Sequence, residues 1–147
     1  METWELEARE SIRDLVARYN ANGDAGRIAP PAELFAADAV LEVPGEELLG
    51  RDAIRDFFDG LARATKNQAE GGVKLIRHFT ATHQIDVHGP DRASGRCYYA
   101  VLTDRGLDHW GRYLDEYRCS GGRWVFSRRR ATLDGRVPGS WSETVRG

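Results

Sequence analysis

The stretch Arg77-His78-Phe79-Thr80-Ala81-Thr82-His83-Gln84-Ile85 opens the part of the chain that decides the fold. It belongs to the first of four segments that are rich in strand-forming residues, at about 74–88, 93–103, 109–119 and 123–134. Short turn sequences that contain glycine, with proline or aspartate at two of them, separate neighbouring segments. This pattern predicts four consecutive antiparallel strands, each joined to the next by a tight turn.

The N-terminal residues have the periodicity of a helix instead. Apolar side chains recur at helical spacing from Trp4 to Tyr19, and charged side chains fill the other face. We expect this helix to run to about Asn20, because the turn-forming residues 22–24 follow it. Asp24 would then lie in an elbow between the first helix and the next element.

Two further helices are expected before the long strands begin. The prolines at 30–31 favour the start of a short second helix that runs through Phe35, and apolar residues at helical spacing over 54–61 predict a third. Residues 40–43 read as a short strand between them. Helices followed by strands indicate an α+β fold, with the helices packed on one side of a curved sheet.

The composition is that of one globular domain. The chain has 147 residues, of which 41% are hydrophobic and 30% are charged, and this is enough to bury a core without metal or disulfide support. We expect the domain to span residues 1–135. Residues 136–147 are polar and should form a tail or a pocket flap, in which Trp141 could cover the mouth of a pocket.

Charge and cysteine content argue against several classes of protein. A formal net charge of −2 makes nucleic acid an improbable partner, since binding a polyanion requires concentrated positive charge. No apolar stretch approaches the roughly 20 residues that span a bilayer, and the acidic N-terminus lacks the apolar segment of an export signal. The two cysteines match no zinc or redox spacing. We therefore expect a cytoplasmic protein with no membrane partner.

His78 is the first candidate for chemistry, and its surroundings leave two interpretations open. Side chains alternate along a strand, so His78 and His83 should point to opposite faces unless a bulge intervenes. A metal site built on this pair is therefore not expected, and no third ligand at metal-binding spacing lies nearby. Taken alone, His78 fits a hydrogen-bonded core position as well as a catalytic one, and Asp24 is more typical of a turn or a helix cap.

A second group of polar residues lies on the third predicted long strand. Alternation puts His109, Tyr113, Asp115 and Tyr117 together on one face of that strand. This face is either a solvated side of the sheet or the wall of a cavity, and the residues alone do not decide between the two. If it lines a cavity, His109 is a candidate second acid.

Five segments occur in a characteristic order along the chain. They are Arg18-Tyr19 with Gly23-Asp24, Glu33-Leu34-Phe35-Ala36-Ala37-Asp38-Ala39-Val40, Leu49-Gly50-Arg51-Asp52-Ala53-Ile54, Arg77-His78 with His83-Gln84-Ile85, and Gly122-Arg123-Trp124-Val125-Phe126-Ser127-Arg128-Arg129. Together they resemble the SnoaL-like branch of the nuclear transport factor 2 (NTF2) superfamily, over about residues 8–135. The resemblance implies a cone, in which three N-terminal helices pack on a strongly bent, mostly antiparallel sheet that encloses an apolar cavity.

The resemblance also implies roles for individual residues. Scytalone dehydratase, bile-acid 7α-dehydratase and hexachlorocyclohexane dehydrochlorinase use an Asp–His pair at the positions that Asp24 and His78 occupy here. Ketosteroid isomerase instead has a carboxylate base where this chain has Val43. Tyr19 falls where several members place a tyrosine that donates a hydrogen bond to substrate, and Arg129 falls where the dehydrochlorinase has a cavity arginine.

Other positions complete the site that the resemblance implies. The family often turns the residues equivalent to Tyr113 and Asp115 toward the cavity, where His109 would also contact the substrate. Phe58, on the third predicted helix, would help to shape the pocket. No cofactor is implied, and members commonly assemble as homo-oligomers, so we expect a dimer or a trimer.

The activity implied by the resemblance is that of a cofactor-independent lyase. The expected reaction is a dehydration of a hydrophobic cyclic molecule such as a polyketide or a steroid, in which Asp24 orients His78 and His78 moves the proton. Two alternatives remain open at this point. The chain is an isomerase or cyclase that enolises its substrate with the same pair, or it is a non-catalytic ligand-binding protein or enzyme small subunit.

Overall fold

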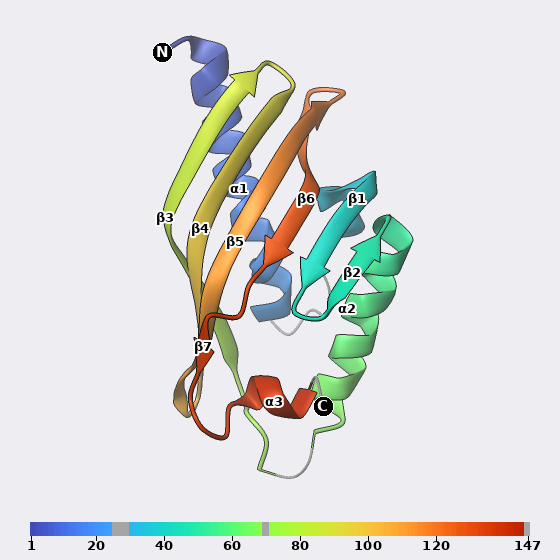
Figure 1. Cartoon of the computed structure of the whole chain (residues 1–147), viewed down its shortest axis with the longest axis vertical. Helices are drawn as coiled ribbons and strands as arrows, with labels where there is room; N and C mark the ends of the chain where they lie inside the picture. The colour runs from blue at the N-terminus through green and yellow to red at the C-terminus, as the bar shows by residue number, and fades with distance from the viewer. Residues whose placement is uncertain (25–29, 69–70, 146–147) are drawn as a thin grey trace.

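The computed structural model describes residues 1–24, 30–68 and 71–145, which form helices packed on a curved sheet (Figure 1). The α+β class and the NTF2-like arrangement expected from the sequence are confirmed. In chain order the described elements are α1 (Thr3–Asp24), the 3-10 helix η1 (Ala32–Leu34), β1 (Phe35–Val43), β2 (Glu46–Leu49), α2 (Arg51–Lys66), β3 (Ile76–Gly89), β4 (Arg92–Thr103), β5 (Gly106–Ser120), β6 (Arg123–Ala131), β7 (Gly135–Arg136) and α3 (Trp141–Val145).

One mixed sheet of seven strands carries the fold, in the order β2-β1-β6-β5-β4-β3, with β7 paired to β5. The strands β1 and β6 run parallel, and the remaining pairs are antiparallel. The four predicted long strands are confirmed as β3 to β6, because each is joined by a short turn to the next. Figure 1 shows α1 lying across these strands, while α2 lies beside β1 and β2.

The prediction of a short helix that runs from the prolines at 30–31 through Phe35 is wrong in its length and type. Only Ala32–Leu34 form a 3-10 turn, and the chain becomes extended at Phe35, where β1 begins. A helix this short gains few backbone hydrogen bonds for the entropy it costs. The parallel pairing of β1 with β6 satisfies the backbone better, and the third α-helix of the described chain is instead α3, near the C-terminus.

The first helix is about one turn longer than predicted. α1 extends to Asp24, whereas the sequence pattern placed its end near Asn20. Asp24 therefore belongs to the last turn of the helix, and the elbow expected beyond it falls on residues 25–29, outside the described part of the chain.

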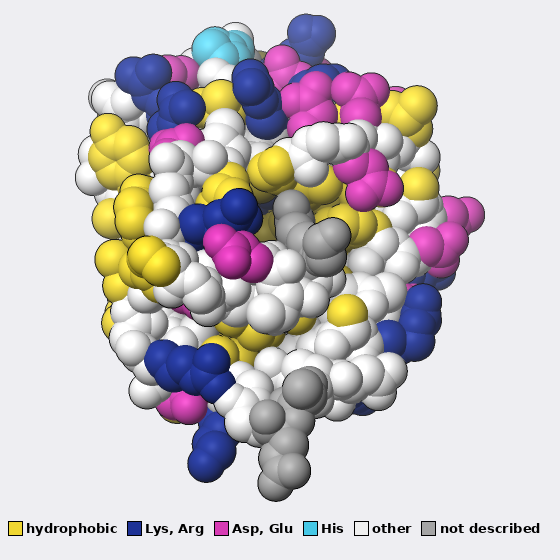
Figure 2. Space-filling view, turned by 60° about the horizontal axis from the view of Figure 1, so that its bottom comes forward, with side chains coloured by type: hydrophobic (Ala, Val, Ile, Leu, Met, Phe, Trp, Pro, Cys, Tyr) yellow, Lys and Arg dark blue, Asp and Glu magenta, His cyan; other side chains and the backbone are white. Residues whose placement is uncertain are grey.

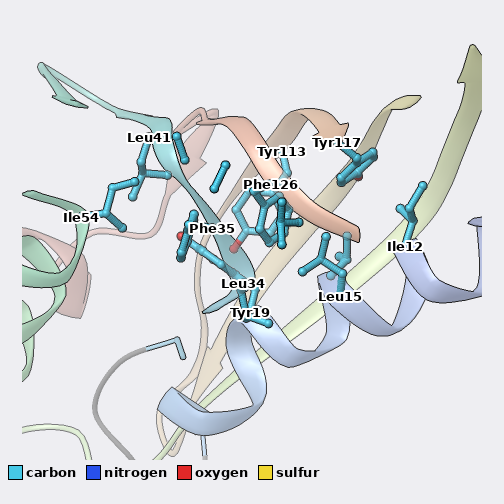
Figure 3. Packing of buried hydrophobic residues seen from close by; sticks show 14 of the residues in the cluster. Ile12, Leu15, Tyr19, Leu34, Phe35, Leu41, Ile54, Tyr113, Tyr117 and Phe126 are labelled. Atoms are coloured by element: carbon cyan, nitrogen blue, oxygen red, sulfur yellow. The ribbon is translucent and has the colours of Figure 1, made fainter. Parts of the chain in front are cut away.

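An aromatic cluster fastens α1 to the sheet (Figure 3). Tyr19 of α1 meets Phe35, Tyr113 and Phe126 edge-on, with ring centroids 5.7 to 6.1 Å apart. Such pairs contribute about 0.5–1.5 kcal/mol each beyond the burial of their area. Because these contacts lie near the C-terminal end of α1, they also fix the position of Asp24 against the sheet.

The described C-terminal residues form a short strand and a helix. The segment expected to be a polar tail or flap contributes β7, which pairs with β5, and the helix α3, which Figure 1 shows at the lower end of the molecule beside α2. No helix in the described residues is both long and apolar enough to cross a membrane.

Candidate active site

A cavity of about 900 Å³ opens at the end of the molecule that carries α3. Figure 2 brings this end forward and shows a hollow with hydrophobic side chains inside it and charged side chains beside it. Polar groups in the lining come from α1, α2, the long strands and the C-terminal residues 136–143. The apolar lining includes Val43, Phe57, Phe58, Leu61, Ile76, Leu133 and Trp141, and the polar lining includes Tyr19, Asn20, Asp24, His78, Tyr99, His109 and Tyr113.

Asp24 and His78 are in direct contact at the wall of this cavity. Oδ1 of Asp24 lies 2.7 Å from Nδ1 of His78, and Oδ2 accepts a hydrogen bond of 2.7 Å from the backbone N–H of the same histidine. The side chains of His78 and Asp24 are 23% and 16% exposed. The carboxylate that holds the ring therefore also ties the end of α1 to β3.

This contact favours one state of the imidazole. A carboxylate beside Nδ1 keeps a proton on that nitrogen, so the lone pair of the neutral ring lies on Nε2. The ring of His78 lines the cavity, and no described residue forms a hydrogen bond with its Nε2. An imidazole held in this way can accept a proton from a bound molecule, and the carboxylate stabilises the imidazolium that forms.

A β-bulge reverses the orientation predicted for His83. Thr82 and His83 of β3 lie opposite the single residue Cys97 of β4, and Thr82 has a φ of 55°. The extra residue shifts the alternation, so Nε2 of His83 lies 3.2 Å from the hydroxyl of the buried Tyr117. The prediction that His78 and His83 point to opposite faces is therefore wrong, because both lie on the core side of the sheet.

The polar face predicted on β5 is buried rather than solvated. Tyr113, Asp115 and Tyr117 are 4%, 5% and 2% exposed, which excludes the solvated-sheet interpretation. Tyr113 and His109 line the cavity, whereas Asp115 and Tyr117 lie deeper and bond to each other through the Tyr117 hydroxyl at 2.9 Å. Alternation along β5 therefore follows the prediction.

Tyr113 provides a protonated hydroxyl in the cavity wall. Its ring stacks on that of Tyr99 at 4.7 Å, and its oxygen accepts a hydrogen bond of 3.3 Å from Nδ2 of Asn20. Burial raises the pKa of Tyr113 well above its ordinary value, so the hydroxyl keeps its proton at neutral pH. It is therefore suited to donate a hydrogen bond to an oxygen of a bound molecule.

Arg129 lies behind the cavity wall. Its fully buried guanidinium donates two hydrogen bonds of 2.8 Å to Asp115 and lies 3.8 to 4.3 Å from the ring centroids of Tyr113, Tyr19 and Phe126. Although burial opposes it, the Asp115 carboxylate raises the pKa of Arg129, so the guanidinium is charged. Two of these rings, Tyr19 and Tyr113, line the cavity, and neither Arg129 nor Asp115 is among the lining residues.

Asp108, which the sequence pattern did not single out, forms a second Asp–His contact. Its Oδ2 lies 2.8 Å from Nδ1 of His109, whose ring lines the cavity. A bulge between β4 and β5 turns Asp108 inward: Val101 pairs with His109, but the next pair is Leu102 with Leu107. The dipeptide Asp108-His109 was the only signal in the sequence, and by itself it indicates nothing about either role.

Val43 and Phe58 both contribute apolar surface to the cavity wall. The described residues contain no group of three His, Cys, Asp or Glu side chains that could hold a metal ion. Burial raises the pKa of the Cys97 thiol to about 11, so it is neutral and a poor nucleophile at neutral pH.

The site thus consists of a cavity walled by helices and a bent sheet in an α+β protein, with an Asp–His pair in its wall. The model of a SnoaL-like domain matches residues 4–130, so the chain belongs to the SnoaL-like family, within the NTF2-like fold. A comparison with curated proteins found no match.

Three solved structures illustrate the similarity. A putative scytalone dehydratase from Novosphingobium aromaticivorans is 20% identical with a TM-score of 0.77, covering 93% of this chain and 91% of its own. An NTF2-like protein with a cystatin-like fold from the same organism is 29% identical with a TM-score of 0.72, covering 93% and 86%. A hexachlorocyclohexane dehydrochlorinase is 18% identical with a TM-score of 0.73, covering 91% and 90%. At such identities the first and third support the fold alone.

Proposed function

We propose that this protein is a cofactor-independent lyase that dehydrates a hydrophobic cyclic small molecule. The observation that carries the proposal is the contact of 2.7 Å between Asp24 and Nδ1 of His78 at the wall of a mostly apolar cavity. The fold is compatible with such an activity, because the solved structures that share it include a putative scytalone dehydratase and a hexachlorocyclohexane dehydrochlorinase.

In the proposed step, Nε2 of His78 removes a proton from a carbon adjacent to a carbonyl group. The electron pair of the broken C–H bond moves into the carbonyl, which becomes an enolate, and Asp24 stabilises the imidazolium. In this proposal the hydroxyl group of Tyr113 donates a hydrogen bond to the enolate oxygen, and Tyr19, which lines the same cavity, is a second candidate donor. The enolate then re-forms the carbonyl, the C–O bond to the β-hydroxyl breaks, and the imidazolium returns its proton to the departing oxygen as water.

The lining supports a hydrophobic ring system as the substrate. A volume of about 900 Å³ is large enough for a molecule of several fused rings, such as a polyketide or a steroid. Phe57, Phe58 and Leu61 of α2 offer apolar contact to such a ring system. In this proposal the reacting polar atoms of the substrate face His78 of β3 and Tyr113 of β5.

Two alternatives are less well supported. An isomerase or cyclase would use the same pair for enolisation without expelling a group, and its product would have the same mass as its substrate. A non-catalytic protein would not need Asp24 and His78 in contact, so their hydrogen bond argues against that alternative.

The experiment is an assay with purified protein on a panel of polyketide-type and steroid-type cyclic β-hydroxyketones, with products identified by mass spectrometry. We expect at least one product lighter by one water, and no turnover by His78→Ala at an unchanged melting temperature. The matched control is His88→Ala, because His88 is exposed and bonds to Ser94 outside the cavity. Full activity of His78→Ala would exclude the mechanism, and a product of unchanged mass would favour the isomerase or cyclase.

The protein should also assemble as a homo-oligomer. Phe79, Ala100 and Trp110 pair in one row across three strands, and Phe79, Tyr98 and Trp110 are 57%, 57% and 37% exposed on the side of the sheet away from the cavity. Exposed aromatic residues grouped in this way are typical of an interface. Sedimentation analysis should give a dimer or trimer that Trp110→Glu weakens, and a monomeric wild type at micromolar concentration would contradict this expectation.

A further inference from the structure

The carboxylate of Asp108 connects the cavity to the C-terminal segment, which we define as residues 135–145. On one side Oδ2 lies 2.8 Å from Nδ1 of His109. On the other side Oδ2 accepts a hydrogen bond of 2.7 Å from the hydroxyl of Ser140, and Oδ1 accepts one of 2.7 Å from the backbone N–H of Trp141. The backbone N–H of Ser142 lies 3.4 Å from Oδ2.

These contacts are buried, so they stabilise the segment more than its exposed ion pair does. Asp108 is 5% exposed and Ser140 is 1% exposed. A buried carboxylate that lost its donors would be left unsolvated, which is costly. By contrast, the ion pair of Arg136 with Glu143 is close to half exposed on both sides, and such pairs contribute little. Asp108 therefore provides the main side-chain anchor of the C-terminal segment, in addition to the backbone pairing of β7 with β5.

The ring that Asp108 holds is placed to act on the same ligand as His78. His78 pairs with Val101 on β4, and Val101 pairs with His109 on β5, so the three residues form one row across the sheet. Directly opposed residues point to the same face, and two strand spacings separate the backbones of the two histidines by about 10 Å. A cyclic molecule bound at His78 therefore lies within reach of His109.

The C-terminal segment forms part of the cavity wall next to the ring of His109. Trp141 lines the cavity, and its indole lies 6.4 Å from the ring of His109. Ser142 and Glu143 also contribute to the lining. The position of these residues therefore determines both the shape of the cavity and the surroundings of His109.

We infer that Asp108 is a positioning residue that couples the seating of the C-terminal segment to the orientation and tautomer of His109. When the segment is seated, donors from Ser140 and Trp141 fix the carboxylate, and the fixed carboxylate holds Nδ1 of His109. When the segment leaves, the carboxylate loses those donors and becomes free to turn toward solvent, so Nδ1 of His109 loses the fixed acceptor that sets its tautomer. This inference concerns the proposed active-site cavity, but its test does not depend on turnover.

The test removes one hydrogen bond to Asp108 without removing Asp108. Trp141 is the first residue of α3, a position where proline is tolerated, so Trp141→Pro eliminates the backbone N–H that bonds to Oδ1. Trp141→Ala is the matched control, because it removes the same indole and keeps the N–H. Ser140→Ala is a second, milder variant that removes the hydroxyl donor to Oδ2.

Two measurements are made on the full chain. Trypsin cleavage after Arg136 in β7 reports release of the C-terminal segment, and ¹⁵N resonances of the histidine side chains report the tautomer of His109. Relative to Trp141→Ala, we expect Trp141→Pro to be cleaved about tenfold faster, as the loss of one hydrogen bond to a charged group predicts. The His109 resonances should shift in Trp141→Pro relative to Trp141→Ala, and in Ser140→Ala relative to the wild type. The resonances of His78, which Asp24 holds, should not shift in either comparison.

Three results would overturn the inference. Faster cleavage with unchanged His109 resonances would mean that Asp108 only fastens the segment. Equal cleavage of Trp141→Pro and Trp141→Ala would mean that the carboxylate does not anchor it. Equal shifts of His78 and His109 would indicate a general loss of structure. None of these results bears on the activity of His78→Ala, so they test this inference independently of the lyase proposal.

Discussion

Asp24 binds His78 twice, once at ring Nδ1 and once at the backbone N–H, both at 2.7 Å. The first bond orients the imidazole, and the second fixes the strand that carries it. Because Asp24 ends α1 and His78 belongs to β3, 54 positions apart in the chain, the aromatic cluster that packs α1 onto the sheet also sets the geometry of the pair.

Asp24→Asn should reduce turnover of any substrate that the wild type converts by about 10²–10⁴-fold. The amide oxygen can still accept the backbone hydrogen bond, but a neutral side chain does not stabilise the imidazolium or fix its tautomer. The melting temperature should therefore change little. Turnover and thermal unfolding are measured on the same preparation.

Asp38→Asn is the matched control for that substitution. Asp38 is a largely exposed carboxylate that pairs with Arg118, away from the cavity, and it should leave turnover unchanged. If Asp24→Asn retained wild-type turnover, the carboxylate would have no part in the proton transfer.

Arg129→Met should lower the free energy of unfolding by about 3–5 kcal/mol. The substitution leaves the Asp115 carboxylate buried without its two donors from the guanidinium. The double variant Arg129→Met with Asp115→Leu should recover much of the loss, because it removes both charges. Urea unfolding of the three proteins measures the difference.

A surface ion pair supplies the comparison for that prediction. Arg18 and Asp14 have side chains that are 65% and 57% exposed, so Arg18→Met should cost less than about 1 kcal/mol. A loss of similar size at Arg18 and Arg129 would show that burial does not govern these pairs.

Local patterns in the sequence were sufficient for much of this architecture. Helical spacing located α1, alternation located β3 to β6, and turn residues separated them, because each signal is contained in a few neighbouring residues. The candidate pair Asp24 and His78 came from the order of family motifs, and the contact between them agrees with that assignment. Its role in catalysis stays a prediction.

Features set by long-range pairing could not be found in this way. The bulge at Thr82 and the one that turns Asp108 inward each depend on the register between two strands, which no window of the sequence contains. A single inserted residue was enough to reverse the orientation predicted for His83. The pairing of β1 with β6 likewise outweighed the local helix signal before Phe35.

Gly111→Ala should destabilise the fold by about 1–3 kcal/mol and disturb the cavity wall. A Cβ at Gly111 would lie 1.9 Å from the carbonyl oxygen of Thr132 and 2.8 Å from Cε1 of Tyr99. The Tyr99 hydroxyl donates to that same carbonyl oxygen at 2.7 Å, so the ring would have to move. Urea unfolding and near-ultraviolet circular dichroism measure the two effects.

Gly89→Ala is the control for this change, because its Cβ would meet nothing closer than Asp91 Oδ1 at 3.9 Å. Gly89 is also a strand residue, so the loss of backbone freedom is comparable. A Gly111→Ala protein as stable as the wild type would mean that β5 and Thr132 move apart with little loss of unfolding free energy.

His83 should make the stability of the protein fall as the pH is lowered. Burial lowers its pKa from the ordinary value of 6.5, although the nearby Asp115 opposes this, and Arg129 and Arg13 add to the lowering. Because the pKa of His83 is lower in the folded protein, the unfolded chain takes up its proton first as the pH falls. The free energy of unfolding is therefore unaffected by this group well above about pH 6.5 and decreases as the pH drops below it.

His83→Gln tests this dependence, since glutamine does not titrate and can still bond to the Tyr117 hydroxyl. The free energy of unfolding, measured with urea at about pH 8 and about pH 5, should fall less in the variant than in the wild type. His88→Gln, which removes an exposed histidine bonded to Ser94, controls for the loss of a histidine in general. Identical pH dependence in His83→Gln and the wild type would mean that His83 is as easily protonated in the folded protein as in the unfolded chain.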